Sequence, residues 1–250
     1  MESSPRLQAY FRSFDEIRGW FTRVDAALLR VLDTIQRRAG VQGDILEIGV
    51  YAGKSAVLLG FLCADGEELT VCDPFEEVPR QEFEATYLRF HERPPIVLRG
   101  SSQALASALP DASFRLVHID GAHDYASVRK DIATARRVLC SGGIVVVDDF
   151  TTLKDPDVTA AVLDEMRSGG LVPCMLSHVK LYASWSPLPE LEPAALLHAL
   201  RAERGVAAEI RPLLRRDMVV AWGPPTLGYA LRTRAPRVYG LLLKMYRSIG

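Results

Sequence analysis

The sequence predicts an α/β protein of the Rossmann-like type: a seven-stranded, mostly parallel sheet with helices on both faces, an N-terminal helical segment and a C-terminal extension. Short apolar runs alternate with segments of helical period between residues 44 and 147. A glycine-rich turn follows the first apolar run, and carboxylates follow later ones. Alternation at this spacing indicates parallel strands joined by right-handed helical crossovers. Ligands of such sheets bind where the strands end, so those positions are the first candidates for a site.

The hydrophobic pattern places each element in order. Apolar residues recur at helical spacing from Ile17 to Ile35, which predicts one or two helices before the first strand, and the glycines of 40–43 end them. The expected strands are 44–48, 68–72, 96–99, 114–119, 144–147, 179–185 and 218–222. The expected helices are 53–64, 79–93, 102–109, 125–139, 157–167 and 193–204. The last two strands are candidates for an antiparallel edge of the same sheet.

Length and composition fit one folded domain with a large core. The chain has 250 residues, of which 48% are hydrophobic and 24% charged. We divide it into a helical segment 1–43, a main domain 44–223 and a tail 224–250, whose GLLLKMYR run would pack on a partner subunit, its own domain or a membrane surface. A net charge of −1 provides no overall field for a polyanion, so a nucleic-acid partner is not expected.

Cysteine spacing and the N-terminus predict a cytoplasmic protein. The four cysteines occur singly without a CxxC pair, which favours reduced core residues over a disulfide framework or a zinc site. The N-terminus lacks a basic-then-apolar signal pattern, and no run approaches the ~20 apolar residues that a membrane-spanning helix needs.

Three carboxylates and one imidazole lie at the ends of two expected strands. The segments IDGAHDY and GGIVVVDDF contain Asp120, His123, Asp148 and Asp149. If the two strands are neighbours, ~4.8 Å apart, these side chains meet at one edge of the sheet. Clustered carboxylates repel unless a proton or cation lies between them, and oxygen ligands suit Mg²⁺ or Mn²⁺. His123 is then a candidate base; the simpler alternative is that the acids only cap turns.

The segment ILEIGVYAGKSA at 45–56 predicts a nucleotide-binding turn. Gly49 and Gly53 allow a sharp turn and close approach of a ligand. The GKS letters resemble a phosphate-binding P-loop, but three residues instead of four separate the glycines. Glu47 before the turn would oppose a triphosphate, whereas Asp73 after the second strand suits a ribose. Ribose plus a cationic amino group describes S-adenosylmethionine.

Further cofactor contacts are expected around this turn. Tyr51 is a lid or core candidate, and Lys54 and Ser55 either contact the cofactor carboxylate or simply begin a helix. Ser102 is either a helix N-cap or part of an adenine loop. Asp120 is counted among the cofactor contacts as well.

Five segments in order resemble the class I S-adenosylmethionine-dependent methyltransferases, and more narrowly the metal-dependent sugar O-methyltransferases of the macrocin and novobiocin type. They are LEIGVYAGKSA, VCDPF, GSSQ, IDGAHDYASVRKDI and VVVDDF, and the resemblance covers about residues 17–185. It implies metal ligands at Asp120, Asp148 and Asp149, with Asp120 also catalytic, and a base at His123. It also implies a sugar or glycoside acceptor. We further expect a homo-oligomer.

Three alternatives stay open at this stage. A catechol offers the same pair of adjacent oxygens as a sugar diol. A P-loop-like nucleotide-binding protein would use the GKS turn differently. A non-catalytic or hydroxylase-like protein could share the scaffold, because a fold does not fix a function.

Overall fold

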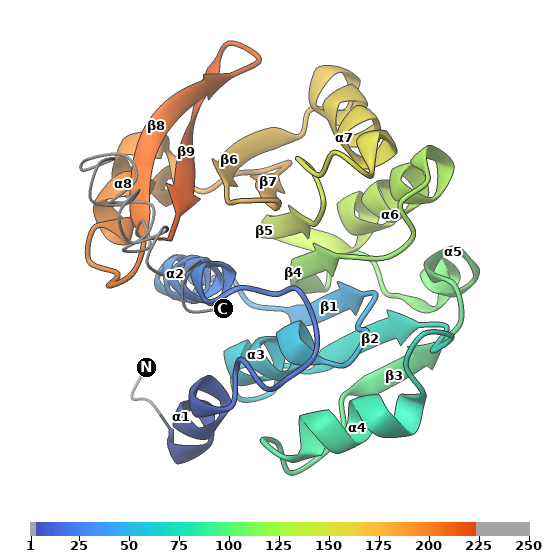
Figure 1. The fold of residues 1–250 in the computed structure, drawn as a ribbon. Coiled ribbons are helices and arrows are strands. Elements are labelled where there is room, and N and C mark those ends of the chain that lie inside the picture. Colours follow the sequence, from blue (N-terminus) through green and yellow to red (C-terminus); the bar gives the residue numbers. More distant parts are fainter. Residues whose placement is uncertain (1–3, 224–250) are drawn as a thin grey trace, which may run out of the picture.

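A computed structural model describes residues 4–223 and shows one nine-stranded sheet in the order β3-β2-β1-β4-β5-β7-β6-β9-β8 (Figure 1). The strands are β1 Asp44–Ile48, β2 Leu69–Asp73, β3 Ile96–Arg99, β4 Phe114–Ile119, β5 Leu139–Val147, β6 Val172–Leu176, β7 Leu181–Ser184, β8 Ala207–Leu213 and β9 Arg216–Trp222. The α-helices are α1 Pro5–Arg12, α2 Arg23–Arg38, α3 Lys54–Leu62, α4 Arg80–Leu88, α5 Ser102–Leu105, α6 Tyr125–Val138, α7 Pro156–Ser168 and α8 Pro193–Leu200. Two short 3₁₀ turns, η1 Ala106–Ala108 and η2 Pro189–Leu191, complete the set.

The central strands run in parallel, as the sequence predicts. β1 pairs in parallel with β2 and β4, and β5 pairs in parallel with β4. β7 is antiparallel to both β5 and β6. The carboxyl ends of β1, β2, β4 and β5 therefore meet at one edge, where the suspected functional residues follow them.

The sheet has nine strands where seven were expected. The two additional strands are β6 and β8. Pro173 lies inside β6, and a proline inside a short run argues against a strand assignment from sequence. No residue of β8 is buried, so the strand has no buried face that would create an alternating pattern. The antiparallel edge is β8, while β9 is parallel to β6.

The N-terminal helices begin and end elsewhere than expected. α1 lies before Ile17, and the chain between α1 and α2 is irregular, although Ile17 and Phe21 are buried. Thr22 accepts a hydrogen bond from the N–H of Asp25 and so caps α2. Ile17 and Phe21 therefore have helical spacing because both side chains are buried, although the chain around them forms no helix.

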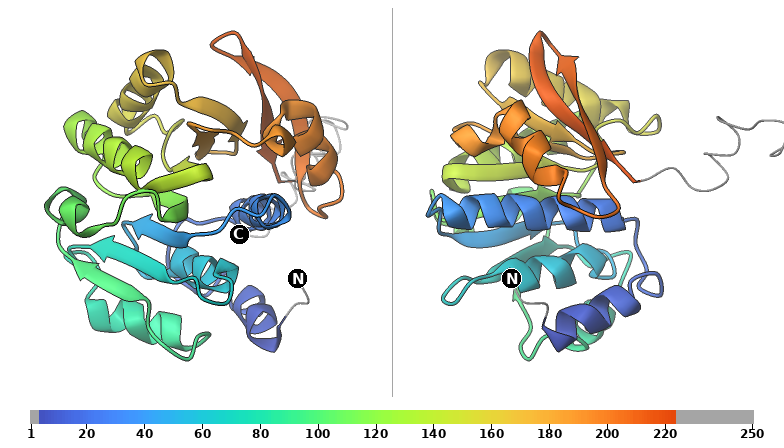
Figure 2. Two further views of the ribbon diagram at one scale, coloured as in Figure 1. Left: turned by 180° about the vertical axis from the view of Figure 1, so that it is seen from behind. Right: turned by 90° about the vertical axis from the view of Figure 1, so that its left-hand side faces the viewer.

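Helices cover both faces of the sheet (Figure 2). One core contains side chains of α1, α2, α3, α4 and α8 against the sheet, and the other contains side chains of α6 and α7. Alternate residues of one strand enter different cores: Leu116 packs in the first and Val117 in the second. This sandwich fixes the strand ends that carry the site.

Two sequence expectations concern the chain as a whole. All four cysteines are free thiols, as expected. Between residues 4 and 223, no helix combines the length and the apolar character needed to cross a membrane. The predicted tail 224–250 lies outside the described residues.

Candidate active site

The glycine turn after β1 packs directly against the end of β4. Gly49 has φ 82°, and a Cβ there would lie 1.8 Å from the backbone oxygen of Asp120. Gly53 has φ 88° and forms the N-cap of α3, where a Cβ would lie 3.0 Å from the ring of Phe83. Only glycine fits the contact at position 49, because this backbone lies in the left-handed region and touches a neighbouring strand. The turn thus joins the predicted cofactor loop to the predicted metal loop.

Asp73 holds the other side of this turn. It is the last residue of β2, and its carboxylate accepts hydrogen bonds from the N–H of Val50 at 2.8 Å and of Phe75 at 2.5 Å. Each carboxylate oxygen can accept a further bond, so the predicted ribose contact fits this position.

Ser102, the predicted adenine-loop residue, donates its hydroxyl to Asp131 of α6. Asp131 is buried, and its Oδ2 atom has no hydrogen-bond partner within the described part of the chain. Burial raises the pKa of Asp131 to about 6, although the Ser102 hydroxyl opposes this rise. The hydroxyl therefore anchors the loop to α6.

Two other residues of this turn, Tyr51 and Lys54, face the N-terminal segment. The Tyr51 hydroxyl accepts from Arg18 at 2.9 Å, and its ring lies 5.3 Å from the ring of Trp20. Lys54 is nearly buried, its Nζ lies 3.4 Å from the oxygen of Gly19, and burial lowers its pKa. Ser55 is buried in α3. The structure does not bring Lys54 to the open side of the turn, which favours its structural role over a contact with the cofactor carboxylate.

A buried chain of polar groups runs under the site across four strands. Glu47 has no exposed surface, and its Oε1 lies 2.8 Å from Nδ1 of His118. Nε2 of His118 lies 3.2 Å from Nζ of Lys180, whose ammonium pairs with Asp148. A charged lysine donates to Nε2, so His118 carries its proton on Nδ1 and donates it to Glu47. Glu47 Oε2 has no partner among the described residues, so a donor from the cofactor could still reach it.

Asp120 and Asp148 are adjacent carboxylates with opposite behaviour. Burial and the charge of Asp148 raise the pKa of Asp120 to about 7. Burial alone would raise the pKa of Asp148 too, but Lys180 and His118 outweigh it and lower that pKa. Two close carboxylates cannot both ionise easily, and their different environments move their two pKa values apart. Asp120 is therefore protonated below about pH 7, whereas Asp148 is ionised there.

His123 lies between two further carboxylates. Its Nε2 lies 3.3 Å from Oδ2 of Asp149, and its Nδ1 lies 3.2 Å from Oδ1 of Asp155. The imidazole is 39% exposed, whereas His118 has no exposed surface. His123 is thus accessible to a substrate, whereas His118 is enclosed in the core.

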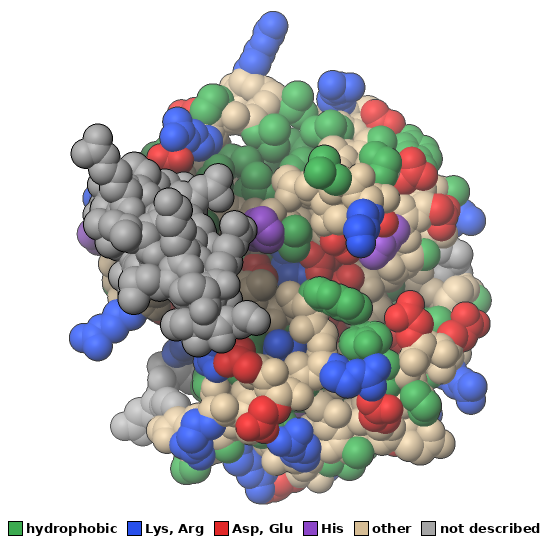
Figure 3. Space-filling model, viewed as in Figure 1, with side chains coloured by type: hydrophobic (Ala, Val, Ile, Leu, Met, Phe, Trp, Pro, Cys, Tyr) green, Lys and Arg blue, Asp and Glu red, His purple; other side chains and the backbone are tan. Residues whose placement is uncertain are grey.

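The loop after β5 presents Asp149 through a fixed turn. Asp149 has φ 56°, and its Oδ1 accepts a 2.6 Å hydrogen bond from the hydroxyl of Thr152. The hydroxyl of Thr151 donates to the oxygen of His178 at 2.7 Å, which joins the loop to the turn between β6 and β7. On the face shown in Figure 3, acidic side chains gather in a hollow over the ends of β4 and β5.

The expected metal ligands fall into two overlapping groups of possible ligands. One contains Asp120, His123 and Asp149, and the other His118, Asp120 and Asp148; within each, the ligand atoms lie within 4.8 Å of one another. The first group is partly exposed and rich in oxygen, which fits Mg²⁺ or Mn²⁺. In the second group, Lys180 already compensates the charge of Asp148. A divalent cation therefore fits best between Asp120 and Asp149, in the first of the two groups.

Sequence reasoning missed Lys180 and Asp155. Lys180 stands directly before the apolar run LYAS, inside a predicted buried strand. A lysine at a buried position is rare unless it is paired with an acid, so this position indicated a charged partner. Asp155 gave no signal, since an aspartate before Pro156 at a helix start is ordinary.

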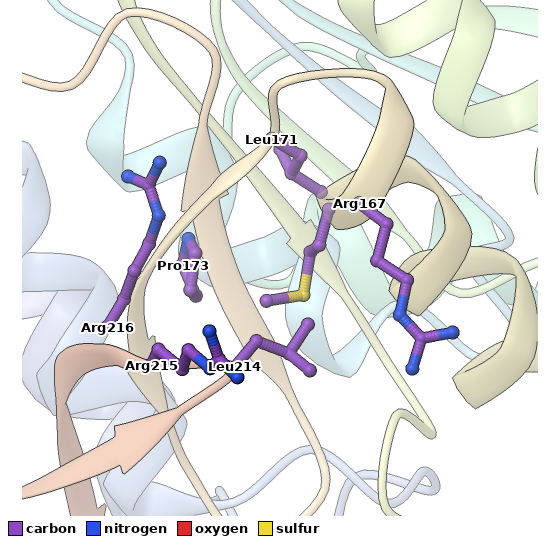
Figure 4. Close-up of a pocket in the computed structure, with 7 residues that line it drawn as sticks. Arg167, Leu171, Pro173, Leu214, Arg215 and Arg216 are labelled. Carbon is purple, nitrogen blue, oxygen red and sulfur yellow. The ribbon is translucent and has the colours of Figure 1, made fainter.

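A separate cavity of about 270 Å³ lies between α7, β6 and the turn that joins β8 to β9 (Figure 4). Its lining residues are Met166, Arg167, Leu171, Pro173, Leu214, Arg215 and Arg216. None of them is a predicted site residue, so this cavity is distinct from the candidate active site.

The order β3-β2-β1-β4-β5-β7-β6, with an antiparallel β7 and a glycine turn after β1, matches the fold expected from the sequence motifs. Residues 46–150 also match the family described as a methyltransferase domain. Residues 46–150 therefore form a methyltransferase domain. The predicted relationship to the class I S-adenosylmethionine-dependent methyltransferases is therefore confirmed at the level of this domain, and its glycine turn needs no P-loop interpretation.

Solved O-methyltransferases share the fold of this methyltransferase. The O-methyltransferase NovP matches with a TM-score of 0.55 and 18% identity, over 65% of this chain and 80% of that one. The TDP-rhamnose 3′-O-methyltransferase CalS11 of calicheamicin biosynthesis matches with a TM-score of 0.51 and 15% identity, over 74% and 96%. A putative caffeoyl-CoA O-methyltransferase from Staphylococcus aureus matches with a TM-score of 0.50 and 16% identity, over 73% and 93%. No curated protein matches the chain by sequence.

Proposed function

We propose that this methyltransferase transfers the methyl group of S-adenosylmethionine to a hydroxyl of a sugar or glycosylated small molecule, with the help of a divalent cation. One observation carries the proposal. Asp120, Asp149 and the accessible His123 converge directly beside the glycine turn that identifies the cofactor side. A base and hard oxygen ligands beside a methyl donor suit an oxygen nucleophile.

The acceptor oxygen would form a bond to the methyl carbon while the carbon–sulfur bond breaks, leaving S-adenosylhomocysteine. The hydroxyl proton would pass to Nε2 of His123, which then lies 3.3 Å from Asp149. That carboxylate stabilises the imidazolium by its charge. A bound divalent cation would lower the pKa of the acceptor hydroxyl and orient it.

Asp120, Asp148 and Asp149 are the proposed cation ligands. Asp149 and Asp120 would contribute most, because Lys180 already compensates the charge of Asp148. In a titration with Mn²⁺ followed by electron paramagnetic resonance, Asp149→Asn should therefore weaken binding more than Asp148→Asn. An equal loss in both variants would contradict this ranking of the ligands.

Exposed apolar side chains flank the site and support a small ring-shaped acceptor. Trp20 is 81% exposed beside Tyr51, and Leu153 is 99% exposed on the loop between Asp149 and Asp155. Large exposed apolar groups at a polar site commonly mark a binding surface. CalS11 is described as acting on TDP-rhamnose, and its fold is shared by this chain, which adds to the support for a sugar.

The deciding experiment measures methyl transfer to a panel of glycosides and catechols, with and without a chelator. We expect transfer to a glycoside that stops in the chelator and returns with Mg²⁺. His123→Ala should lower kcat on the order of 10²-fold or more, because a sugar hydroxyl needs a base. If only catechols are methylated, the acceptor is a catechol and the sugar assignment is wrong. Full activity in the chelator would show that the reaction needs no divalent cation.

Cofactor contacts need a separate measurement. By calorimetry, Asp73→Ala should lower the affinity for S-adenosylhomocysteine markedly, and the wild-type protein should not bind ATP. An unchanged affinity in the variant would show that Asp73 does not bind the ribose. We further propose that the enzyme acts in the cytoplasm as a homo-oligomer.

A further inference from the structure

The cavity between α7, β6 and the β8–β9 turn is lined by groups of two kinds. Leu171 precedes β6 and Pro173 lies in it, and both are buried, so they form an apolar floor. Arg167 of α7 lies on one side of this floor, and Arg215 and Arg216 of the hairpin lie on the other (Figure 4). None of the described residues that line the cavity carries a carboxylate. The cavity therefore combines an apolar floor with a cationic rim.

The positive charges of these three arginines are not compensated within the described part of the chain. No described side chain forms an ion pair or a hydrogen bond with their guanidinium groups. Glu165, two residues before Arg167, is already paired with Arg129 and Arg136. Asp217 follows the last of the three on β9 and so points to the opposite face of the sheet. Like charges around one cavity repel, and an anion between them removes this repulsion.

The turn that carries two of the lining residues has an unfavourable backbone. Leu214 and Arg215 form a two-residue connection between the paired residues Leu213 and Arg216. Their φ angles are 49° and 65°, in the left-handed region, where hairpin turns of this length strongly prefer Asn-Gly. Both side chains line the cavity. Backbone strain of this kind gathers at ligand sites, because the side chains that cause it are needed there.

The cavity lies at the edge of the sheet opposite the candidate active site. β7 is antiparallel to both β5 and β6, so β5 and β6 run in the same direction. Pro173 near the start of β6 is therefore at the edge where β5 begins, whereas Asp149 follows the end of β5. Arg216, the first residue of β9, is at the same edge as Pro173, because β9 is parallel to β6. A ligand in this cavity would thus be separate from the cofactor and the acceptor.

We propose that this cavity binds a small organic phosphate, with the phosphate group on the arginines and a compact apolar group on the floor. Guanidinium groups match phosphate oxygens in geometry and charge, and several of them favour a doubly charged anion. The volume of about 270 Å³ is close to the lower limit of ~300 Å³ for small-molecule sites, so the ligand is compact. The site does not depend on the proposed methyl transfer.

Nuclear magnetic resonance of the arginine Nε–H groups, in a buffer free of phosphate and sulfate, tests the site with phenyl phosphate as the probe. The signals of the three lining arginines should shift in a saturable way, and those of Arg211, on the same hairpin but outside the cavity, should not. Phenyl phosphate should bind at least ~10-fold more tightly than inorganic phosphate, because its ring covers the apolar floor. Excess S-adenosylhomocysteine should leave this binding unchanged.

Three results of this titration would overturn the proposal. Equal shifts at Arg211 would mean non-specific association of an anion. Displacement by S-adenosylhomocysteine would place the probe in the cofactor site. Equal affinities for phenyl phosphate and inorganic phosphate would mean that the apolar floor takes no part.

A double variant tests the hairpin turn. Leu214→Asn with Arg215→Gly supplies the residues that the backbone prefers, so it should raise the urea midpoint of unfolding and weaken phenyl phosphate binding at least ~10-fold. Arg211→Gln is the matched control and should keep the wild-type affinity. Unchanged binding in the double variant, or a double variant less stable than the wild type, would overturn the proposal. Because these measurements need no methyl transfer, failure of the proposed function would leave their outcome unaffected.

Discussion

At the scale of single residues, Asp120 couples the site to the stability of the fold. Its pKa is about 7 in the folded protein, compared with 3.8 as its ordinary value. A raised pKa means that the folded state prefers the protonated acid. The resulting stabilisation is complete below about pH 4 and is lost as the pH rises through about 7.

Asp120→Asn should therefore change stability in a pH-dependent way in metal-free protein. The amide cannot ionise, so the stability of the variant relative to the wild type should rise by roughly 2 to 3 kcal/mol between pH 5 and pH 8. Urea unfolding in a chelator measures this difference, with the exposed Asp65→Asn as a control. A difference between wild type and variant that is the same at both pH values would contradict the assignment.

At the scale of elements, the β6–β7 hairpin is fixed by the first turn of α2. The hydroxyls of Ser177 and Tyr182 donate to Oδ1 of Asp25 at 2.6 and 3.0 Å, and all three residues are buried. The turn of this hairpin carries Lys180 into the site. The position of Lys180 therefore depends on α2, whose contact residue Asp25 is more than 150 residues from Ser177 in the sequence.

Tyr182→Phe should destabilise the protein by about 1 to 2 kcal/mol, because it removes one buried hydrogen bond to a charged acceptor. The matched control is Tyr125→Phe, which removes a similar bond to Asp164 on the surface. Chemical denaturation should show a smaller loss for the control. Equal losses would mean that burial of the Asp25 contact adds nothing to its strength.

At the scale of the whole molecule, Arg115 joins layers of the fold below the sheet edge opposite the site. Its guanidinium is fully buried and lies 2.9 Å from both Asp33 and Glu67. It also donates to Gln36 Oε1 and to the backbone oxygen of Leu62. One side chain of β4 thus connects α2, the end of α3 and the loop before β2.

Arg115→Met should lower the free energy of unfolding by roughly 3 to 5 kcal/mol, because it leaves buried carboxylates without their cation. Arg211→Met removes an exposed pair with Glu209 and should cost less than ~1 kcal/mol. Thermal and urea unfolding of both variants provide the comparison. A small loss for Arg115→Met would show that Arg37, which also pairs with Asp33, is sufficient.

The sequence by itself determined the parallel core and the place of the site. Strands such as 44–48 and 114–119 have short buried runs, and their period is a local property of the chain. Gly49 and Asp73 were predictable for the same reason, since a turn and a strand end are read from adjacent residues. Asp120 and His123 followed from their position after such a strand.

Only the tertiary structure decided how these groups pair. Antiparallel β7 brings Lys180 against Asp148, and the start of α7 brings Asp155 against His123. Lys54, for which the sequence left a cofactor contact and a helix start open, lies against Gly19 of the N-terminal segment. Charge compensation and proton position depend on distances across the fold. Local patterns in a sequence do not contain those distances, because strand order and helix packing set them.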